Sequence, residues 1–289
     1  MTALIQAMRP RQWLKNLLVL AAPGAGGVIA RAPVLQRSSL ALGAFCLASS
    51  SMYLVNDVID APADRLHPTR RRRPVAEGRL SPGVALGAAI GLLGIATAAG
   101  WWLGPRFLLV LGAFAVLALS YSLVLKRIAV IDIAAVASGF LLRAIAGGVA
   151  TGISSSRWFL LLTSFGSLFV VAGKRYQEAG SRPAAGSGGP PARLPAYTRP
   201  YLRYVWTMAS TLTIAAYCLW VLSFHPHTVR VLVALSSVPF VLAVLRYGLL
   251  LDAGLGGTPE DVFLGDRALQ SLAVAWLAVY GGGVYLAAR

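Results

Sequence analysis

Charged residues are scarce in this chain of 289 residues, and acidic residues are the scarcest. Only 12% of the residues are charged and only 10 are Asp or Glu, whereas soluble domains are roughly a quarter charged. The two cysteines, Cys46 and Cys218, both lie in apolar stretches, which argues against a disulfide framework and a cysteine-ligated metal site. Apolar residues make up 57% of the chain and its mean hydropathy is +0.70, so the composition predicts an integral membrane protein.

An excess of positive charge is the second compositional feature. The chain has 26 Lys and Arg residues against 10 Asp and Glu residues, a formal net charge of +16. In a soluble protein this balance would suggest nucleic-acid binding, but the apolar composition leaves no soluble domain to carry such a face. Anionic lipid headgroups of the membrane and anionic substrates are therefore the expected partners, and nucleic acid is not.

Apolar stretches of roughly 20 residues, the length that crosses a bilayer, recur along the whole chain. Arg9 and Arg11 followed by an apolar run resemble a signal peptide, but Lys15 and Asn16 interrupt that run, so we expect a retained first span. The sequence predicts an all-α integral membrane protein, a single transmembrane catalytic domain over residues 1–289. Its nine predicted spans are 13–30, 38–57, 83–101, 105–125, 131–151, 157–173, 204–224, 229–250 and 268–287.

The charged residues orient these spans. With the N-terminus inside, most Lys and Arg residues fall in the cytoplasmic connections, as the positive-inside rule requires. All 10 acidic residues fall on that side too, which the rule does not demand. A transporter or lipid flippase is expected to place ionisable groups near the midplane or on both faces. The pattern favours an enzyme of the inner (plasma) membrane whose active site faces the cytoplasm.

Arg143 is the one charged residue expected deep within a span. An arginine there is costly, so it should face the bundle interior and have a partner. A structural role is favoured over the alternative, in which it guides a lipid phosphate.

The strongest chemical signal is an acidic motif at the inner end of the second predicted span. Asp57, Asp60 and Asp64 stand at i, i+3 and i+7, so on a helix they share one face, with Asn56 one turn from Asp60. Converging carboxylates repel one another unless a cation lies among them. Hard oxygen ligands favour Mg²⁺, and substrate phosphate oxygens commonly complete the coordination shell of that ion. We therefore expect these three aspartates to be catalytic metal ligands. The alternative is a solvated acidic helix end, and Pro62 could end the helix before Asp64.

Cationic side chains lie at the same end of the predicted spans. Most of Arg70–Arg73 are expected to anchor on anionic lipids, with one or two turned toward a substrate phosphate. Singly, the other candidates could be ordinary interfacial residues, but together with the acidic motif they suit an anionic substrate bridged by metal. The candidate substrate-binding residues are Lys15, Asn56, Arg73, Tyr121, Lys126, Lys174, Arg175 and Glu178.

The acidic motif resembles the signature of the UbiA superfamily of intramembrane prenyltransferases, N/D-D-x-x-D-x-x-x-D, which Asn56, Asp57, Asp60 and Asp64 match in full. The resemblance implies a UbiA-type bundle of nine transmembrane helices with cytoplasmic catalytic loops. That family usually has a second acidic motif, D-x-x-x-D, after the sixth helix. Here residues 173–178 read Gly-Lys-Arg-Tyr-Gln-Glu, with two cations and one acid, so the chain departs from the usual pattern.

This departure is similar to one branch of the superfamily, which transfers phosphoribosyl groups to decaprenyl phosphate in arabinan synthesis for actinobacterial cell walls. The similar segments are 9–16, 121–126, 139–148, 173–176 and 201–206. The resemblance implies 5-phosphoribosyl 1-diphosphate as donor, a polyprenyl phosphate as acceptor and Mg²⁺ on the acidic motif. It further implies that Lys126, Lys174 and Arg175 hold donor phosphates and that Tyr121 orients the diphosphate.

Two questions stay open at this point. The ordinary superfamily reaction, prenyl transfer from a prenyl diphosphate to an aromatic or quinone-precursor acceptor, is the alternative function. Small-residue faces such as 83–94 permit close helix packing within or between subunits, so the sequence is also compatible with a homo-oligomer.

Overall fold

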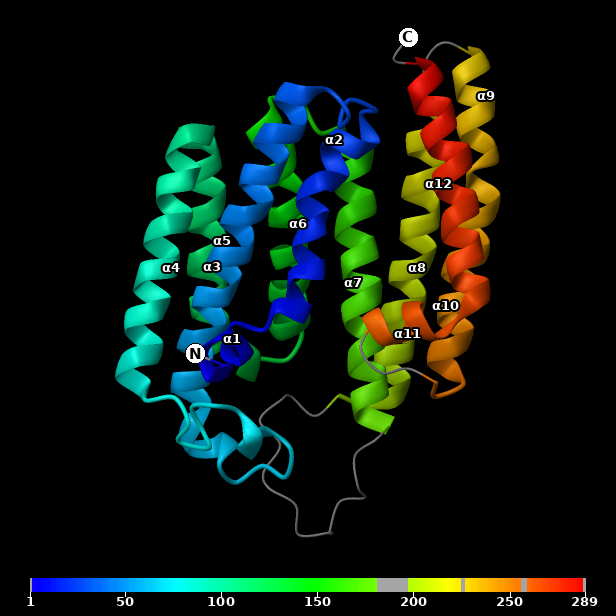
Figure 1. Ribbon diagram of the computed structural model, residues 1–289. Helices are drawn as coiled ribbons and strands as arrows, with labels where there is room; N and C mark the ends of the chain where they lie inside the picture. The colour runs from blue at the N-terminus through cyan, green and yellow to red at the C-terminus, as the bar shows by residue number, and fades with distance from the viewer. Residues whose placement is uncertain (1, 181–196, 225–226, 256–258, 288–289) are drawn as a thin grey trace.

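Every regular element in the described part of the chain is a helix. The computed structural model describes residues 2–180, 197–224, 227–255 and 259–287. The long helices stand side by side as a bundle (Figure 1). Within these described residues, seven helical stretches are long and apolar enough to cross a membrane, which makes the chain a multi-pass membrane protein. They are α3 (Ala32–Asp64), α4 (Pro82–Leu103), α5 (Pro105–Leu123), α6 (Ile131–Thr151), α8 (Arg199–Leu222), α9 with α10 (His227–Leu235 and Ser237–Asp252) and α12 (Arg267–Ala287).

The expected count of nine spans is not confirmed, because two predicted spans fall outside these seven stretches. The first, 13–30, is built from a 3-10 helix, η1 (Pro10–Leu20), and the short helix α2 (Ala21–Ala25). The other, 157–173, lies in α7 (Arg157–Gly180), a continuous helix in the middle of the bundle. Arginine at its start and Lys174-Arg175 near its end lower the mean hydropathy of α7.

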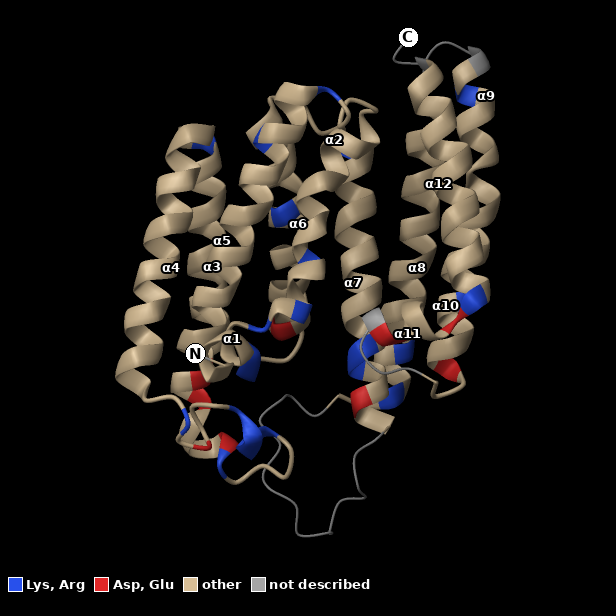
Figure 2. Ribbon diagram, viewed as in Figure 1, with Lys and Arg blue, Asp and Glu red and all other residues tan. Residues whose placement is uncertain are grey.

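The remaining short helices gather at one end of the bundle, together with the charged residues. They are α1 (Thr2–Met8), η2 (Arg70–Arg72), η3 (Leu125–Arg127) and α11 (Pro259–Gly265). In Figure 2 the Asp and Glu residues lie toward this lower end, and many of the basic residues lie there with them. The described acidic residues are therefore segregated along the bundle axis, as their sequence positions predict.

Local sequence signals explain several helix ends. Pro82 and Pro105 begin α4 and α5 at the position where a missing backbone N–H costs nothing. The Ser81 hydroxyl accepts a hydrogen bond from the Val84 N–H at 3.3 Å and caps α4. At the opposite end of the bundle Arg37 donates to the Ala150 carbonyl at 2.5 Å and the Leu103 carbonyl at 3.0 Å. One arginine thus satisfies carbonyls in the last turns of two helices.

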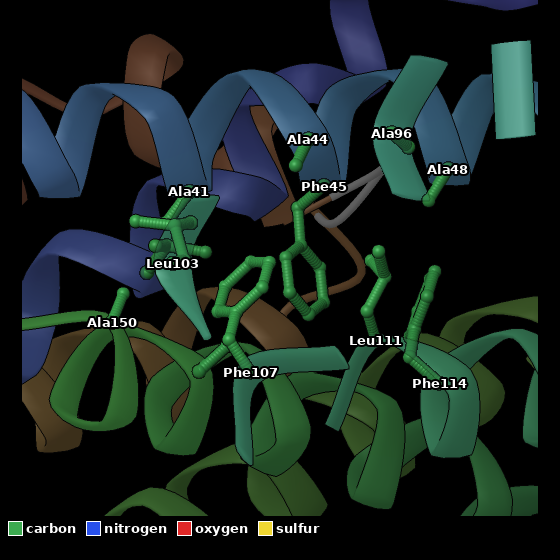
Figure 3. Packing of buried hydrophobic residues seen from close by; sticks show 12 residues of the cluster. Ala41, Ala44, Phe45, Ala48, Ala96, Leu103, Phe107, Leu111, Phe114 and Ala150 are labelled. Atoms are coloured by element: carbon green, nitrogen blue, oxygen red, sulfur yellow. The ribbon is translucent and has the colours of Figure 1, made fainter. Parts of the chain in front are cut away.

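The core between α3, α4, α5 and α6 combines small residues with aromatic rings. Phe45 on α3 lies 6.0 Å from Phe107 and 5.2 Å from Phe114 of α5, measured between ring centroids. Figure 3 shows these rings pointing toward one another beneath the alanines of α3. A second core, which includes residues of α8, α9, α10 and α12, centres on Tyr217, whose ring stacks on Phe240 of α10 at 4.0 Å.

The 3-10 helix η1 lies directly on the backbone of α6. A Cβ atom placed on Gly147 would come within 1.8 Å of the Val19 carbonyl oxygen, so only glycine permits this approach. By contrast, among the described residues no heavy atom comes within 4 Å of a Cβ placed on Gly83, Gly87, Gly91 or Gly94 of α4. These four glycines do not pack within the described chain, whereas Ala85 and Ala89 of the same stretch are buried in a cluster with residues of α3, and the homo-oligomer stays a prediction.

Arg143 is buried in α6 and joins η1 to α3. Its guanidinium donates to Asn16 Oδ1 at 2.7 Å, to Ser49 Oγ at 3.1 Å and to the Gly139 carbonyl at 2.7 Å. It also lies 4.5 Å from the centroid of the Phe114 ring. All of these partners are neutral, and only 7% of the residue is exposed. The network has the geometry of a structural tie between three segments.

We predict that Arg143→Gln lowers thermal stability and leaves the Michaelis constant for the expected polyprenyl phosphate acceptor unchanged. Hydrogen bonds to a charged group contribute about 1.5–3 kcal/mol each, and a glutamine amide cannot replace all three. Thermal unfolding in detergent, alongside acceptor titrations, measures both quantities. Arg106→Gln, at an exposed arginine on α5, is the matched control. Intact stability with weakened use of the lipid would assign Arg143 to substrate guidance instead.

Candidate active site

The last turns of α3 carry the acidic cluster, which we define as Asn56, Asp57, Asp60 and Asp64. The helix runs through Pro62 to Asp64, so all four residues lie on one helix, and Pro62 does not place Asp64 in a loop. Asp57 and Asp64 are almost fully buried, at 1% and 0% exposed. A buried carboxylate is costly unless a counter-charge lies against it, so the partners of this pair define the site.

Two arginines from different segments neutralise the buried pair. Arg9, immediately before η1, donates a hydrogen bond to Asp57 Oδ1. Arg73, immediately after η2, places its Nη1 atom 2.6 Å from Asp64 Oδ2 and 3.4 Å from Asp57 Oδ1. Within the Arg70–Arg73 run, Arg71 and Arg72 are exposed, and Arg73 is turned toward the acids.

Asp60 faces a third cation. Lys126 of η3 places its Nζ atom 2.7 Å from Asp60 Oδ1, and Asn56 donates to Asp60 Oδ2 at 3.2 Å. The structure therefore brings Lys126 to the acidic cluster although the two are far apart in sequence. It also divides the three carboxylates, because Asp57 and Asp64 share Arg73 while Asp60 contacts Lys126.

The oxygen atoms of the acidic cluster fit a divalent cation that is bound in part by substrate. Within the described residues, no three Asp, Glu, His or Cys side chains lie close enough to hold a metal together. Asp57 and Asp64 nevertheless flank one positively charged atom, Nη1 of Arg73. Mg²⁺ is commonly held by one or two carboxylates, with waters and phosphate oxygens completing its shell. The pair suits that kind of shared site and does not form a closed protein cage.

A second group of polar residues surrounds the end of α7. We call it the α7 cluster and define it as Tyr121, Asp132, Arg175, Glu178 and Tyr197. Arg175 Nη1 donates to Glu178 Oε2 at 2.8 Å, and Nη2 donates to the Tyr121 hydroxyl at 3.1 Å and lies 3.2 Å from Asp132 Oδ2. Because Tyr121 is followed within one turn by η3, the segment from α5 to η3 contacts both the α7 cluster and the acidic cluster.

The two cations of α7 are held differently. The Arg175 side chain is 11% exposed and enclosed by acidic and phenolic groups, whereas that of Lys174 is 42% exposed and lies 4.0 Å from Glu178. Of the expected substrate-binding cations, Lys174 is therefore the more accessible to a ligand. Lys15 is partly buried on η1, next to the buried Asn16.

Three residues that belong to these clusters or contact them were not expected from the sequence as site residues. Arg9 has a left-handed backbone conformation, with φ of 55°, and the basic start of the chain gave no indication that it would reach Asp57. Asp132 is one of only 10 acids and lies in the first turn of α6, which is a signal that could have marked it. No local pattern points to Tyr197, which reaches Asp132 from 65 residues away.

The chain is similar along almost its whole length to the UbiA family profile and to several bacterial proteins. Residues 17–264 match the sequence profile of the UbiA prenyltransferase family. Decaprenyl-phosphate phosphoribosyltransferase of Mycobacterium tuberculosis is 46% identical over 285 residues, which cover 97% of this chain and 93% of that protein. Proteins of the same name from Mycolicibacterium smegmatis and Corynebacterium glutamicum are each 44% identical, covering 98% of this chain and 93% and 87% of their own lengths.

The fold is also found in solved structures. A UbiA homologue from Archaeoglobus fulgidus, bound to GPP and Mg²⁺, has a TM-score of 0.76 at 19% identity and covers 98% of this chain and 99% of its own. A UbiA homologue from Aeropyrum pernix K1 has a TM-score of 0.66 at 19% identity, covering 95% and 98%. With its sequence matching the family profile over most of its length and its fold matching these structures, the chain belongs to the UbiA prenyltransferase family.

Proposed function

We propose that this protein transfers the 5-phosphoribosyl group of 5-phosphoribosyl 1-diphosphate to a polyprenyl phosphate such as decaprenyl phosphate. The observation that carries the proposal is the similarity, at 44–46% identity over 97–98% of the chain, to proteins named decaprenyl-phosphate phosphoribosyltransferase. The products are polyprenyl-phosphoryl-5-phosphoribose and diphosphate, and the lipid product would serve arabinan precursor synthesis.

The charge at the end of α7 suits this donor. A prenyl diphosphate has one anionic group, whereas 5-phosphoribosyl 1-diphosphate carries a 5-phosphate in addition to its diphosphate. The donor therefore needs cations beyond a metal site, and Lys174 and Arg175 stand where a second acidic motif is usual. We assign Lys126, Lys174 and Arg175 to the donor phosphates and Tyr121 to orientation of the diphosphate, with Glu178 fixing Arg175. We assign Lys15 to contact with either substrate.

The acidic cluster is proposed as the magnesium site. Asp57, Asp60 and Asp64, with Asn56 assisting, would hold Mg²⁺ against the donor diphosphate. When bound there, Mg²⁺ offsets the charge that builds on the leaving diphosphate. Arg73, which now lies between Asp57 and Asp64, would stay close to the anionic donor when these carboxylates hold the metal. The Archaeoglobus structure with GPP and Mg²⁺ supports divalent-metal use in this fold.

The reaction itself needs positioning more than acid–base chemistry. An oxygen of the lipid phosphate attacks C1 of the ribose from the face opposite the diphosphate, and the C1–O bond to diphosphate breaks with its electron pair leaving on diphosphate. A phosphate monoester is already anionic near neutral pH, so no strong general base is required. His67 fits this view, because its ring nitrogen lies in a local turn with Thr69, outside both clusters.

The site is proposed to face the cytoplasm from one transmembrane catalytic domain of the inner membrane. The proposed donor is a soluble polyanion, and the described acidic residues lie toward one end of the bundle, where many of the basic residues also lie (Figure 2). The acceptor would keep its prenyl chain in the bilayer and present its phosphate at that end.

A donor test separates the proposal from ordinary prenyl transfer. Purified protein in detergent is incubated with radiolabelled 5-phosphoribosyl 1-diphosphate and polyprenyl phosphate, and in parallel with a labelled prenyl diphosphate and aromatic acceptors. Label from the phosphoribosyl donor should enter the lipid fraction. Label entering an aromatic acceptor from the prenyl donor would establish the alternative, and activity confined to sealed vesicles would indicate a transporter.

The magnesium assignment predicts that Asp64→Asn nearly abolishes turnover while the protein stays folded. The substitution removes a negative ligand and keeps the side-chain volume, and Asp57→Asn should behave in the same way. Initial rates with and without EDTA, and after Mg²⁺ is added back, measure the effect. Glu77→Gln changes an exposed acid in the connection between α3 and α4 and serves as control. Full activity in EDTA would refute the magnesium site.

The donor assignment predicts that Lys174→Ala raises the Michaelis constant for 5-phosphoribosyl 1-diphosphate at least tenfold and leaves that for the lipid unchanged. A charge-assisted contact to phosphate is worth roughly 1.5–3 kcal/mol, which corresponds to such a loss. Steady-state kinetics in both substrates provide the comparison. Arg127→Ala, an exposed cation at the same end, is the control. An unchanged donor constant would return Lys174 to the role of a membrane-interface charge.

A further inference from the structure

Asp132 is the most completely buried acid outside the acidic cluster. It lies in the first turn of α6 with 0% exposure. One carboxylate oxygen, Oδ1, accepts a hydrogen bond from the Tyr197 hydroxyl, and the other, Oδ2, lies 3.2 Å from Arg175 Nη2. Asp132 therefore stands between a tyrosine that precedes α8 and an arginine of α7.

The backbone before Asp132 has an uncommon conformation. Val130 has φ of 68°, a positive value that a β-branched residue rarely adopts because it is sterically strained. The Val130 N–H donates to the same Tyr197 hydroxyl at 2.5 Å. A single phenol thus holds both the carboxylate and the turn that presents it, as its one proton and two lone pairs allow.

Tyr197 is a neutral donor at physiological pH. Its partial burial and its hydrogen bond to Asp132 both raise the pKa of Tyr197 above the ordinary value. The proton of the phenol therefore stays between the two residues and leaves the charge of Asp132 for Arg175.

One donor of Arg175, the Nε–H, is buried without a hydrogen-bond acceptor in the described part of the chain. Its Nη1 and Nη2 atoms contact Glu178, Tyr121 and Asp132, but its buried Nε has no hydrogen-bond acceptor among the described residues. A buried N–H without a partner is costly. An oxygen of an anionic ligand would supply the missing acceptor, which is what a donor-binding arginine requires.

We propose that Asp132 and Tyr197 are positioning residues for the phosphoribosyl donor, acting through Arg175. Tyr197 orients the Asp132 carboxylate, and Asp132 fixes one edge of the Arg175 guanidinium. The Nε–H of Arg175 is then presented to a donor phosphate oxygen. The inference rests on the proposed function, and it assigns a role to a buried acid that the acidic motif does not include.

The test is a double-mutant cycle in steady-state kinetics. Tyr197→Phe and Asp132→Asn should each raise the Michaelis constant for the donor about three- to tenfold, with little change in that for the lipid or in kcat. In the background of Arg175→Ala, Tyr197→Phe should add less than about twofold, because the residue through which it acts is gone. Tyr201→Phe is the matched control, since Tyr201 stacks on the Tyr197 ring at 5.7 Å and is not placed in the site.

The outcomes separate a positioning role from a structural one. Equal losses for donor and lipid together with a lower unfolding temperature would mean that the pair only stabilises the fold. An additive effect in the Arg175→Ala background would show that Tyr197 does not act through Arg175. If the wild-type protein uses a prenyl diphosphate, the proposed function fails, and the same cycle with that donor still tests the positioning role.

Discussion

Three carboxylates, those of Asp57, Asp64 and Asp132, are buried at one end of an apolar bundle, and each is tolerated there because a guanidinium lies against it. Isolated ionised carboxylates in such surroundings would cost far more than the fold can supply. The pairing also ties distant segments together. It joins the N-terminal region and the connection after α3 to α3 itself, and it joins α7 to α6. The site end of the protein is thus organised by charge, whereas the rest of the bundle is organised by apolar packing.

Periodic features were the ones that the sequence predicted well. The spacing of Asp57, Asp60 and Asp64 places them on the last turns of one helix, and seven predicted spans lie in seven helical stretches. The first predicted span was less accurate, because a hydropathy window does not distinguish a 3-10 segment from a spanning helix. The partner of Asp57 could not be read locally, since Arg9 lies 48 residues away and is brought to it by the packing of η1.

The departure from the second acidic motif has a physical counterpart in the structure. Two adjacent cations replace acids at the end of α7, yet the local charge is balanced by Glu178 and by Asp132 from another helix. Arg175 is consequently enclosed, while Lys174 is exposed. Asp132 comes from a different helix and is 43 residues before Arg175 in sequence, so the motif alone does not point to it.

The contact of Gly147 with the Val19 carbonyl fixes the position of η1 against α6. At this contact the backbone of η1 lies directly on the backbone of α6, with no side chain between them. Gly147 therefore sets the spacing between η1 and α6. A side chain at position 147 would displace η1, which carries Lys15 and begins directly after Arg9. The placement of Arg9 against Asp57 therefore depends in part on Gly147, a residue outside the acidic cluster that contributes by leaving room for a backbone carbonyl.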